Sequence, residues 1–294
     1  MSYVETHTPG GSGQREFIPE IVQRPFLSDI LPKLSSDDQR ELSRAIVWML
    51  AFVAPLNGQA EDFARLERLV PPGFDRQFYY QLGATAMRRF PKELPKAVAA
   101  VEFVRHRSAA LHHLALVGIY RSWPQVASPD ASPELLVTSP IAVTPELQPH
   151  YWRALGFLTG RYWYYDTERS LGLLNAHLHV FVPRLDPSVQ RAFLQGVGEL
   201  LYIHLTNSPW VPPAELERFP YAYQEGLLEG WGMALGEDEL FSPFPWKGQE
   251  SPFWIASTKG FSARSLVSVQ QGKAQFEALF EGPAPSAPGP PLRQ

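Results

Sequence analysis

The 294-residue sequence predicts a mainly α-helical, multi-helix globular fold with glycine-containing helices and at most minor β elements. Helix start signals, in which Ser, Thr or Asp precedes acidic residues or proline, recur along the chain. They open segments whose apolar residues lie three or four positions apart, as on one face of a helix. Hydrophobic residues make up 45% of the chain and charged residues 19%, a composition typical of a packed globular protein.

The N-terminal helical region is predicted over residues 17–122, after a Gly- and Ser-rich stretch (1–16) expected to be disordered. It begins with a proline-containing arm. Ser36 is then the predicted N-cap of a first helix, with Gln39 at the capping-box position, and this helix ends before Pro55. Further helices are predicted over residues 61–69, 74–90 and 94–121, the last in one or two pieces.

A proline-rich crossover is predicted over residues 123–145, with a soft domain boundary. Residues 134–144 (ELLVTSPIAVT) allow two short strands inside it, although an ordered extended segment fits better. The C-terminal helical region, 146–281, follows. The tail, 282–294, is rich in Pro and Ala and is expected to be disordered.

Paired cap and proline signals mark the helices of the C-terminal region. Thr144-Pro145 opens an aromatic-rich helix, and the near-alternating AHLHVFV of residues 176–182 is the strongest strand candidate. The remaining helices are predicted from Asp186-Pro187 to Leu205, from Pro212-Pro213 to a C-cap at Gly236, and from Ser262 or Ser265 to Phe280.

Composition excludes several function classes. The absence of cysteine removes disulfides, thiolate metal sites and cysteine nucleophiles, and fits a reducing cytoplasm. A net charge of −4 without a basic block gives no nucleic-acid footprint. The apolar runs are too short for a membrane span, and no signal peptide is evident. No P-loop, dinucleotide fingerprint or G-x-S-x-G is present, and no cofactor is predicted.

Glycines inside predicted helices are the most unusual feature, since each costs roughly 0.5–1 kcal/mol relative to alanine. Pairs four residues apart lie on one helix face: Gly156 with Gly160, Gly226 with Gly230, and Gly232 with Gly236. Their simplest explanation is close approach of two helices, with the neighbouring aromatic residues packed around them. The alternative is a groove in which a ligand lies against bare backbone.

Three of these helices, FLQGVG (193–198), EGWGMA (229–234) and QGKAQF (271–276), carry a further resemblance. In this order they resemble the glycine-centred motifs of an uncharacterised protein family found in enediyne biosynthetic gene clusters, over roughly residues 190–280. The family pattern has an acid where Leu194 stands and a basic residue where Glu199 stands. The resemblance implies a helper role in small-molecule biosynthesis and assigns no catalytic residue.

Candidate site residues fall into three groups. Aromatic residues with arginine are typical of ligand pockets, and here the predicted ligand-binding residues are Trp152, Arg161, Tyr162, Trp163, Gly230 and Trp231. A histidine cluster for acid–base chemistry would use His177 and His179, on one side of the predicted strand, with His204 and Glu199. A metal site would use Glu102, His106 and His113, although hydrogen-bonded surface histidines are the better explanation.

The sequence therefore predicts a soluble, cytoplasmic helical accessory protein that binds an apolar or aromatic small molecule. The first alternative is a scaffold that binds another protein or a second copy of itself. The second alternative is a metal- or histidine-dependent enzyme. The sequence leaves the ligand, the reaction and the oligomeric state open.

Overall fold

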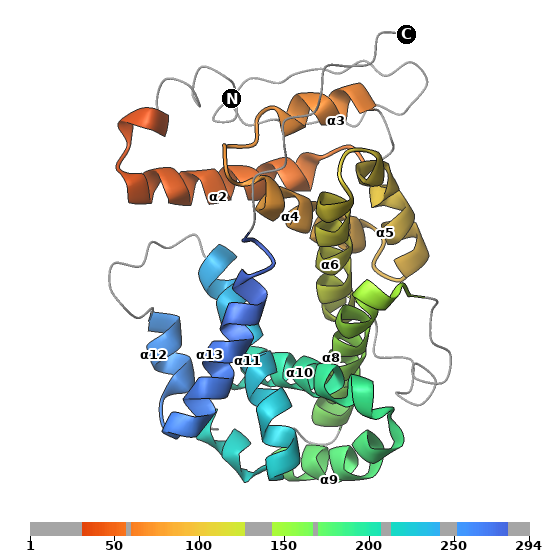
Figure 1. Ribbon diagram of the computed structural model, residues 1–294, viewed down its shortest axis with the longest axis vertical. Coiled ribbons are helices and arrows are strands. Elements are labelled where there is room, and N and C mark those ends of the chain that lie inside the picture. Colours follow the sequence, from red (N-terminus) through yellow and green to blue (C-terminus); the bar gives the residue numbers. More distant parts are fainter. Residues whose placement is uncertain are drawn as a thin grey trace. The chain divides into compact units, whose positions relative to one another are not determined.

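The computed structural model describes residues 31–56, 60–126, 143–166, 170–206, 213–241 and 252–281 (Figure 1). Within these ranges the chain is helical and contains no strand, which confirms the predicted fold class. The residues form two compact units, and the division falls between Ile119 and Tyr120. The predicted disordered ends lie outside the described residues, and so does the segment 134–144, which allowed two short strands, up to residue 142.

The described residues of unit 1, the part before Tyr120, form four α-helices, two 3-10 helices and the start of a fifth α-helix. In chain order these are η2 (Leu31–Lys33), α2 (Ser36–Val53), α3 (Ala60–Glu67), α4 (Asp75–Arg89), α5 (Leu94–Val101), η3 (Glu102–His106) and α6 (Ala109–Val126). Every residue of α4 from Phe78 to Met87 is buried. It packs on α2 and α5, and Phe63 of α3 meets the Phe103 ring edge-on at 4.6 Å.

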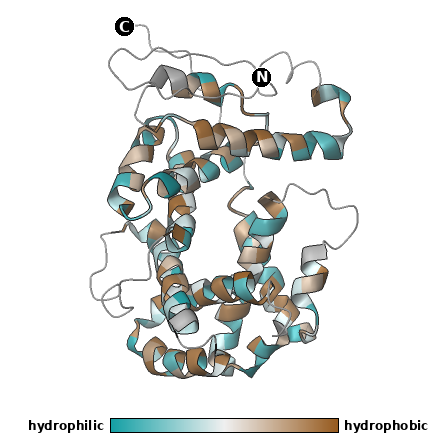
Figure 2. Ribbon diagram, turned by 180° about the vertical axis from the view of Figure 1, so that it is seen from behind, coloured by the Kyte–Doolittle hydropathy of each residue, from teal (hydrophilic) through white to brown (hydrophobic). Residues whose placement is uncertain are grey.

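The first residues of α2 show how the sequence defines a helix end. The side chain of Ser35 accepts a hydrogen bond from the backbone N–H of Asp38, so Ser35 is the N-cap and the predicted Ser36 is the first helical residue. Figure 2 shows the first half of α2 as hydrophilic and its second half as hydrophobic. Buried Ile46, Val47 and Leu50 lie in that second half.

Unit 2, the part from Tyr120 onward, is built mainly from four helices that pack in chain order. Its elements are η4 (Pro145–Leu147), α8 (Gln148–Asp166), α9 (Leu171–Phe181), η5 (Val182–Arg184), α10 (Pro187–Leu205), η6 (Pro213–Arg218), α11 (Tyr221–Phe241), α12 (Pro252–Thr258) and α13 (Ala263–Glu277). The four main helices are α8, α10, α11 and α13. α10 lies between α8 and α11 in Figure 1, and α11 packs in turn on α13. All residues of 193–202 and 226–236 are buried, as expected for helices covered on every side.

A reciprocal glycine contact joins each consecutive pair of these helices. A Cβ atom at Gly156 of α8 would overlap the carbonyl group of Phe193, which lies three residues before Gly196 of α10. A Cβ atom at Gly196 would overlap the carbonyl group of Arg153, three residues before Gly156. The same relation joins Gly198 with Gly230, Gly232 with Gly272 and, in unit 1, Gly83 with Gly118.

The middle helices carry two such glycines each, separated by a single residue. Gly196 faces α8 and Gly198 faces α11, because positions two apart on a helix point to nearly opposite sides. Gly230 and Gly232 on α11 likewise face α10 and α13. Close helix approach is thus confirmed as the reason for the glycines. Glycines two residues apart on one helix thus contact two different neighbouring helices. The predicted pairs, which are four residues apart, lie on a single helix face.

Several predicted element boundaries are corrected. Residues 176–182, predicted as a strand, lie in helix α9 and the start of η5: Ser170 caps α9, and its buried residues Leu174, Leu178 and Phe181 are spaced as on one helix face. α11 runs past Gly236 to Phe241, because Gly236 keeps a helical backbone. The segment 94–121, predicted as a helix in one or two pieces, forms two α-helices, α5 and α6, with the 3-10 helix η3 between them.

The capping residues predicted for two C-terminal helices are confirmed. Asp186 accepts a hydrogen bond from the backbone N–H of Ser188 at the start of α10. Ser262 accepts one from the backbone N–H of Ser265 at the start of α13. None of the described helices is long and apolar enough to cross a membrane.

Candidate functional site

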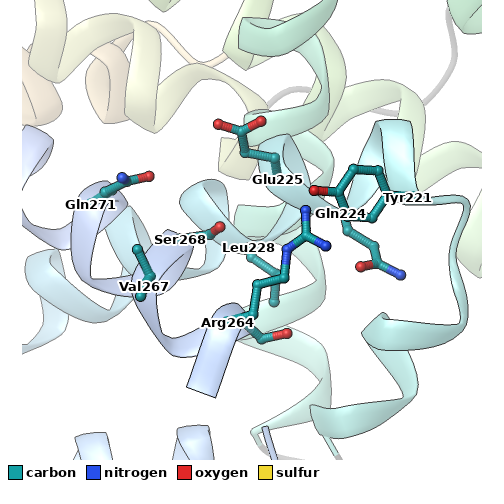
Figure 3. A pocket seen from close by; sticks show the side chains of 9 residues that line it. Tyr221, Gln224, Glu225, Leu228, Arg264, Val267, Ser268 and Gln271 are labelled. Atoms are coloured by element: carbon teal, nitrogen blue, oxygen red, sulfur yellow. The ribbon is translucent and has the colours of Figure 1, made fainter. Parts of the chain in front are cut away.

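A groove of about 310 Å³ lies between α11 and α13 in unit 2 (Figure 3). One wall comes from α11 and the other from α13. Its lining residues are Tyr221, Gln224, Glu225 and Leu228 on α11, and Arg264, Ser265, Val267, Ser268 and Gln271 on α13. Most lining residues of each wall have another lining residue three or four positions away, so each wall is one face of a helix.

The groove exists because α11 and α13 meet closely at one point. Leu228 lies one turn before Gly232, and Gln271 is next to Gly272, the two glycines of the α11–α13 crossing. The groove therefore occupies the space toward the N-terminal ends of both helices. Two straight helices that touch at a crossing separate on either side of it, and side chains of ordinary size leave a concave surface there.

Arg264 is the charged group that stands out in this groove. Its guanidinium lies over the Tyr221 ring, 3.7 Å from the ring centroid. It makes no hydrogen bond or ion pair with any residue that the structure describes. Figure 3 shows the Arg264 side chain reaching from α13 toward Tyr221, Gln224 and Glu225 of α11. Stacking uses the face of the guanidinium and leaves the N–H donors in its plane available.

Other lining residues are fixed by contacts around the groove. Gln224 donates from Nε2 to the carbonyl oxygens of Glu217 and Phe219, at 2.7 and 2.8 Å. Ser265 donates its hydroxyl to Glu217 at 2.5 Å. Glu217 thus ties η6 to both helices at this end of the groove, and these walls are positioned before any ligand arrives.

Glu225 is the acidic group of the groove. Its carboxylate lies 2.9 Å from Nη2 of Arg191 on α10, and both side chains are exposed. Arg191 also pairs with the fully buried Glu229, at 2.8 Å from Nε, and Gln195 donates to the same carboxylate at 3.0 Å. Hydrogen bonding to Glu229 is the main cause that raises the pKa of Arg191, so this guanidinium is always charged.

A second ionic cluster is buried deeper in unit 2. Glu199 of α10 lies 2.6 Å from Arg121 and 3.5 Å from Arg153, and all three side chains are buried. Burial raises the pKa of Glu199, and the two guanidinium groups oppose that shift. Arg121 also donates from Nε to Glu237 at 3.0 Å. The cluster joins α6, α8, α10 and α11, and opposite charges lie next to one another in it, as in a structural ion-pair network.

The predicted ligand-binding residues lie elsewhere. Trp231 is fully buried and meets Tyr202 and Phe261 edge-on, and Gly230 is at the α10–α11 crossing. Trp163 is buried and stacks on His177, with 5.1 Å between ring centroids. Half-buried Trp152 and Tyr162 lie on α8 with Arg161, which donates to the carbonyl oxygen of Pro124 at 3.1 Å. None of the six lines the groove between α11 and α13.

The residues predicted for acid–base chemistry have separate surroundings. Because residues 177 and 179 are on a helix, His177 and His179 do not share a side as they would on a strand. His177 stacks on Trp163 and His179 is exposed. His204 stacks on Tyr164, whereas Glu199 is paired with arginines.

The predicted metal ligands also have different neighbours. Glu102 pairs with Arg105 at 2.8 Å and with His112 at 3.2 Å, whereas His106 is exposed in η3 and His113 is half-buried in α6. Among the described residues, no three His, Asp or Glu side chains are grouped as metal ligands would be.

Sequence reasoning missed Tyr221 and Arg264. They are 43 positions apart (264 − 221), and each belongs to an ordinary amphipathic pattern on its own helix. The available signal was the glycine pair Gly232 and Gly272, which fixes how α11 and α13 face each other. A comparison with models of protein families, with curated proteins and with solved structures found no match for this chain.

Proposed function

We propose that this protein is a helical accessory protein that binds a small molecule in the groove between α11 and α13. The observation that carries the proposal is Arg264, whose guanidinium stacks on Tyr221 at the edge of a concave surface and has no ion-pair partner among the described residues. A volume of about 310 Å³ is at the lower end of the range for ligand pockets, roughly 300–1,000 Å³.

The contacts behind the groove support binding without rearrangement. Glu217 holds Ser265, and the Glu217 and Phe219 carbonyls hold Gln224, so two of the lining side chains already have fixed positions. A preformed site avoids much of the entropy cost of ordering side chains on binding. The buried aromatic residues of the C-terminal region support this role indirectly, since they hold the helices that form the walls.

The proposed setting is small-molecule biosynthesis in the cytoplasm. It rests on the resemblance of residues 190–280 to the family from enediyne biosynthetic gene clusters, and on the absence of cysteine from the chain. An accessory protein of this kind would bind a biosynthetic intermediate and present or protect it.

Filling the groove tests the proposal. Ser268→Trp places a large side chain in the groove, whereas Gln270→Trp places the same side chain on an exposed position of α13 that does not line it. A collection of small fragments is screened against all three proteins by ligand-observed nuclear magnetic resonance. We expect a set of fragments that binds the wild type and Gln270→Trp and is lost with Ser268→Trp. Equal binding to all three proteins would show that the groove is not the site.

A second candidate function is self-association through α2. Trp48 and Phe52 stack on each other with 5.6 Å between ring centroids, yet 49% and 54% of their surface is exposed. Large exposed aromatic pairs are typical of protein interfaces. Sedimentation velocity compares the wild type with a Trp48→Ser, Phe52→Ser double variant. A dimer that disappears in the variant supports this role, and a monomeric wild type at high concentration contradicts it.

A further inference from the structure

We infer that the ligand of the α11–α13 groove is a small monocarboxylate with an apolar body. The inference rests on the proposed function and names the chemical class that the groove selects. Three features of the lining carry it: the Arg264 guanidinium, which has no ion-pair partner among the described residues, the exposed apolar surface of Val267 and Tyr221, and the negative charge of Glu225.

The Arg264 guanidinium lies over the Tyr221 ring and has no ion-pair partner among the described residues, so it can bind a carboxylate. A guanidinium held flat on an aromatic ring presents two parallel N–H donors along one edge, and this fork matches the two oxygens of a carboxylate. The Tyr221 ring restricts the rotation of the Arg264 head group, because its centroid lies 3.7 Å from the central carbon of the guanidinium. No described carboxylate occupies this position, so the recognition geometry is available to a ligand.

Apolar side chains lie in the same groove. Val267 on the α13 wall is 52% exposed, whereas Leu228 on the α11 wall is almost fully buried and contributes little accessible surface. Tyr221, which is 62% exposed, adds the edge of its ring. A ligand whose carboxylate reaches Arg264 can therefore place an aliphatic or aromatic body between α11 and α13. Ser268 and Gln271 provide hydrogen-bonding groups on the α13 wall.

Glu225 limits the charge that the groove accepts. Its carboxylate is part of the lining, so a ligand with two or more negative charges would place one of them close to Glu225. Arg191 neutralises Glu225 only in part, because that ion pair is exposed to solvent. The groove thus favours a single negative charge over a phosphate dianion.

Titration with four simple probes tests the class. The probes are benzoate, its neutral analogue benzamide, the cation benzylamine, and inorganic phosphate, each followed by changes in protein amide signals. The proteins are the wild type, Arg264→Gln, Arg264→Lys and the groove-filling Ser268→Trp. Arg218→Gln is the control, because it removes an exposed arginine from η6 outside the groove. Melting temperatures establish that each variant is folded.

We expect benzoate to bind the wild type most tightly of the four probes. Arg264→Gln should weaken benzoate binding about tenfold, which is the loss expected for a charge-assisted hydrogen-bonded pair, and should leave benzamide unchanged. Arg218→Gln should bind benzoate as the wild type does. Arg264→Lys keeps the charge without the fork and should fall between the wild type and Arg264→Gln.

Two results overturn the inference and differ in what they say about the proposed function. If benzamide or benzylamine binds the groove as well as benzoate, and Arg264→Gln changes nothing, the ligand class is wrong and the groove remains a binding site. If benzoate binds equally to Ser268→Trp, or is weakened equally by Arg264→Gln and Arg218→Gln, binding is not in the groove and the proposed function fails as well.

Discussion

Gly232 and Gly272 show at the residue scale how unit 2 is held together. A Cβ atom at Gly232 would overlap the carbonyl group of Val269, and one at Gly272 would overlap the carbonyl group of Glu229. Both neighbours are helix backbone, which cannot move aside as the end of a flexible side chain can. The backbones of α11 and α13 therefore approach closely only because both residues lack a side chain.

Gly232→Ala should therefore lower the free energy of unfolding by about 1–3 kcal/mol or more, because the added methyl group forces the two helices apart. Gly172→Ala is the matched control, since this glycine is exposed near the start of α9 and its nearest contact would be 3.6 Å away. The control should retain stability or gain up to about 1 kcal/mol. Urea denaturation measures both. A Gly232→Ala protein as stable as the wild type would show that the crossing is not tightly packed.

Helix α2 shows at the element scale what a single capping residue contributes. The Ser35 hydroxyl accepts a hydrogen bond from the backbone N–H of Asp38 and also donates to the Asp38 carboxylate at 2.6 Å. Ser36 is already inside the helix. The capping position is therefore Ser35, one residue before the Ser36 that the sequence predicted.

Ser35→Ala should reduce stability by about 1 kcal/mol, because the Asp38 N–H loses its acceptor. Ser36→Ala is the control and should change stability by no more than a few tenths of a kcal/mol, since alanine is a good helix former. Thermal unfolding followed by circular dichroism compares the two. The reverse order of effects would place the cap at Ser36.

Local signals in the sequence predicted most helices because caps and apolar spacing act within one element. Asp186 and Ser262 opened α10 and α13 as predicted. The strand predicted at 176–182 was wrong, because a short apolar run fits both the two-residue period of a strand and the 3.6-residue period of a helix. Here the burial of Leu174 and Leu178 on one face favours the helix.

The candidate site was less predictable than the helices, because it depends on two of them together. Arg264 and Tyr221 meet only once α11 and α13 cross at Gly232 and Gly272. The aromatic residues that the sequence favoured, such as Trp163 and Trp231, carry large apolar rings, and these rings are buried in the core.

Three buried tyrosines influence the stability of the whole molecule at high pH. Burial is the main cause that raises the pKa of Tyr79, Tyr120 and Tyr202 above the ordinary value of 10.0. The folded protein therefore keeps these phenols protonated at pH values where the unfolded chain ionises them. Because the unfolded state then binds fewer protons, stability must fall as the pH rises above about 10.

Each of these phenols should cost up to about 1.4 kcal/mol of stability per pH unit above 10. Denaturation with urea between pH 8 and 11 measures the loss, and absorbance of tyrosinate reports ionisation. Tyr202→Phe should reduce the slope, whereas Tyr221→Phe, which changes an exposed ring, should leave it unaltered. Stability that stays constant up to pH 11 would show that the three phenols ionise in the folded protein.

Unit 2 thus has a packed interior and a surface groove, which we propose as the binding site. The glycine crossings and the Glu199 cluster fill the interior of unit 2, and the groove lies at the N-terminal ends of α11 and α13. Backbone amide signals followed during a benzoate titration locate the binding surface directly. Shifts confined to residues 221–228 and 264–271 are predicted. Shifts centred on Trp152, Tyr162 and Trp163 instead would contradict the account.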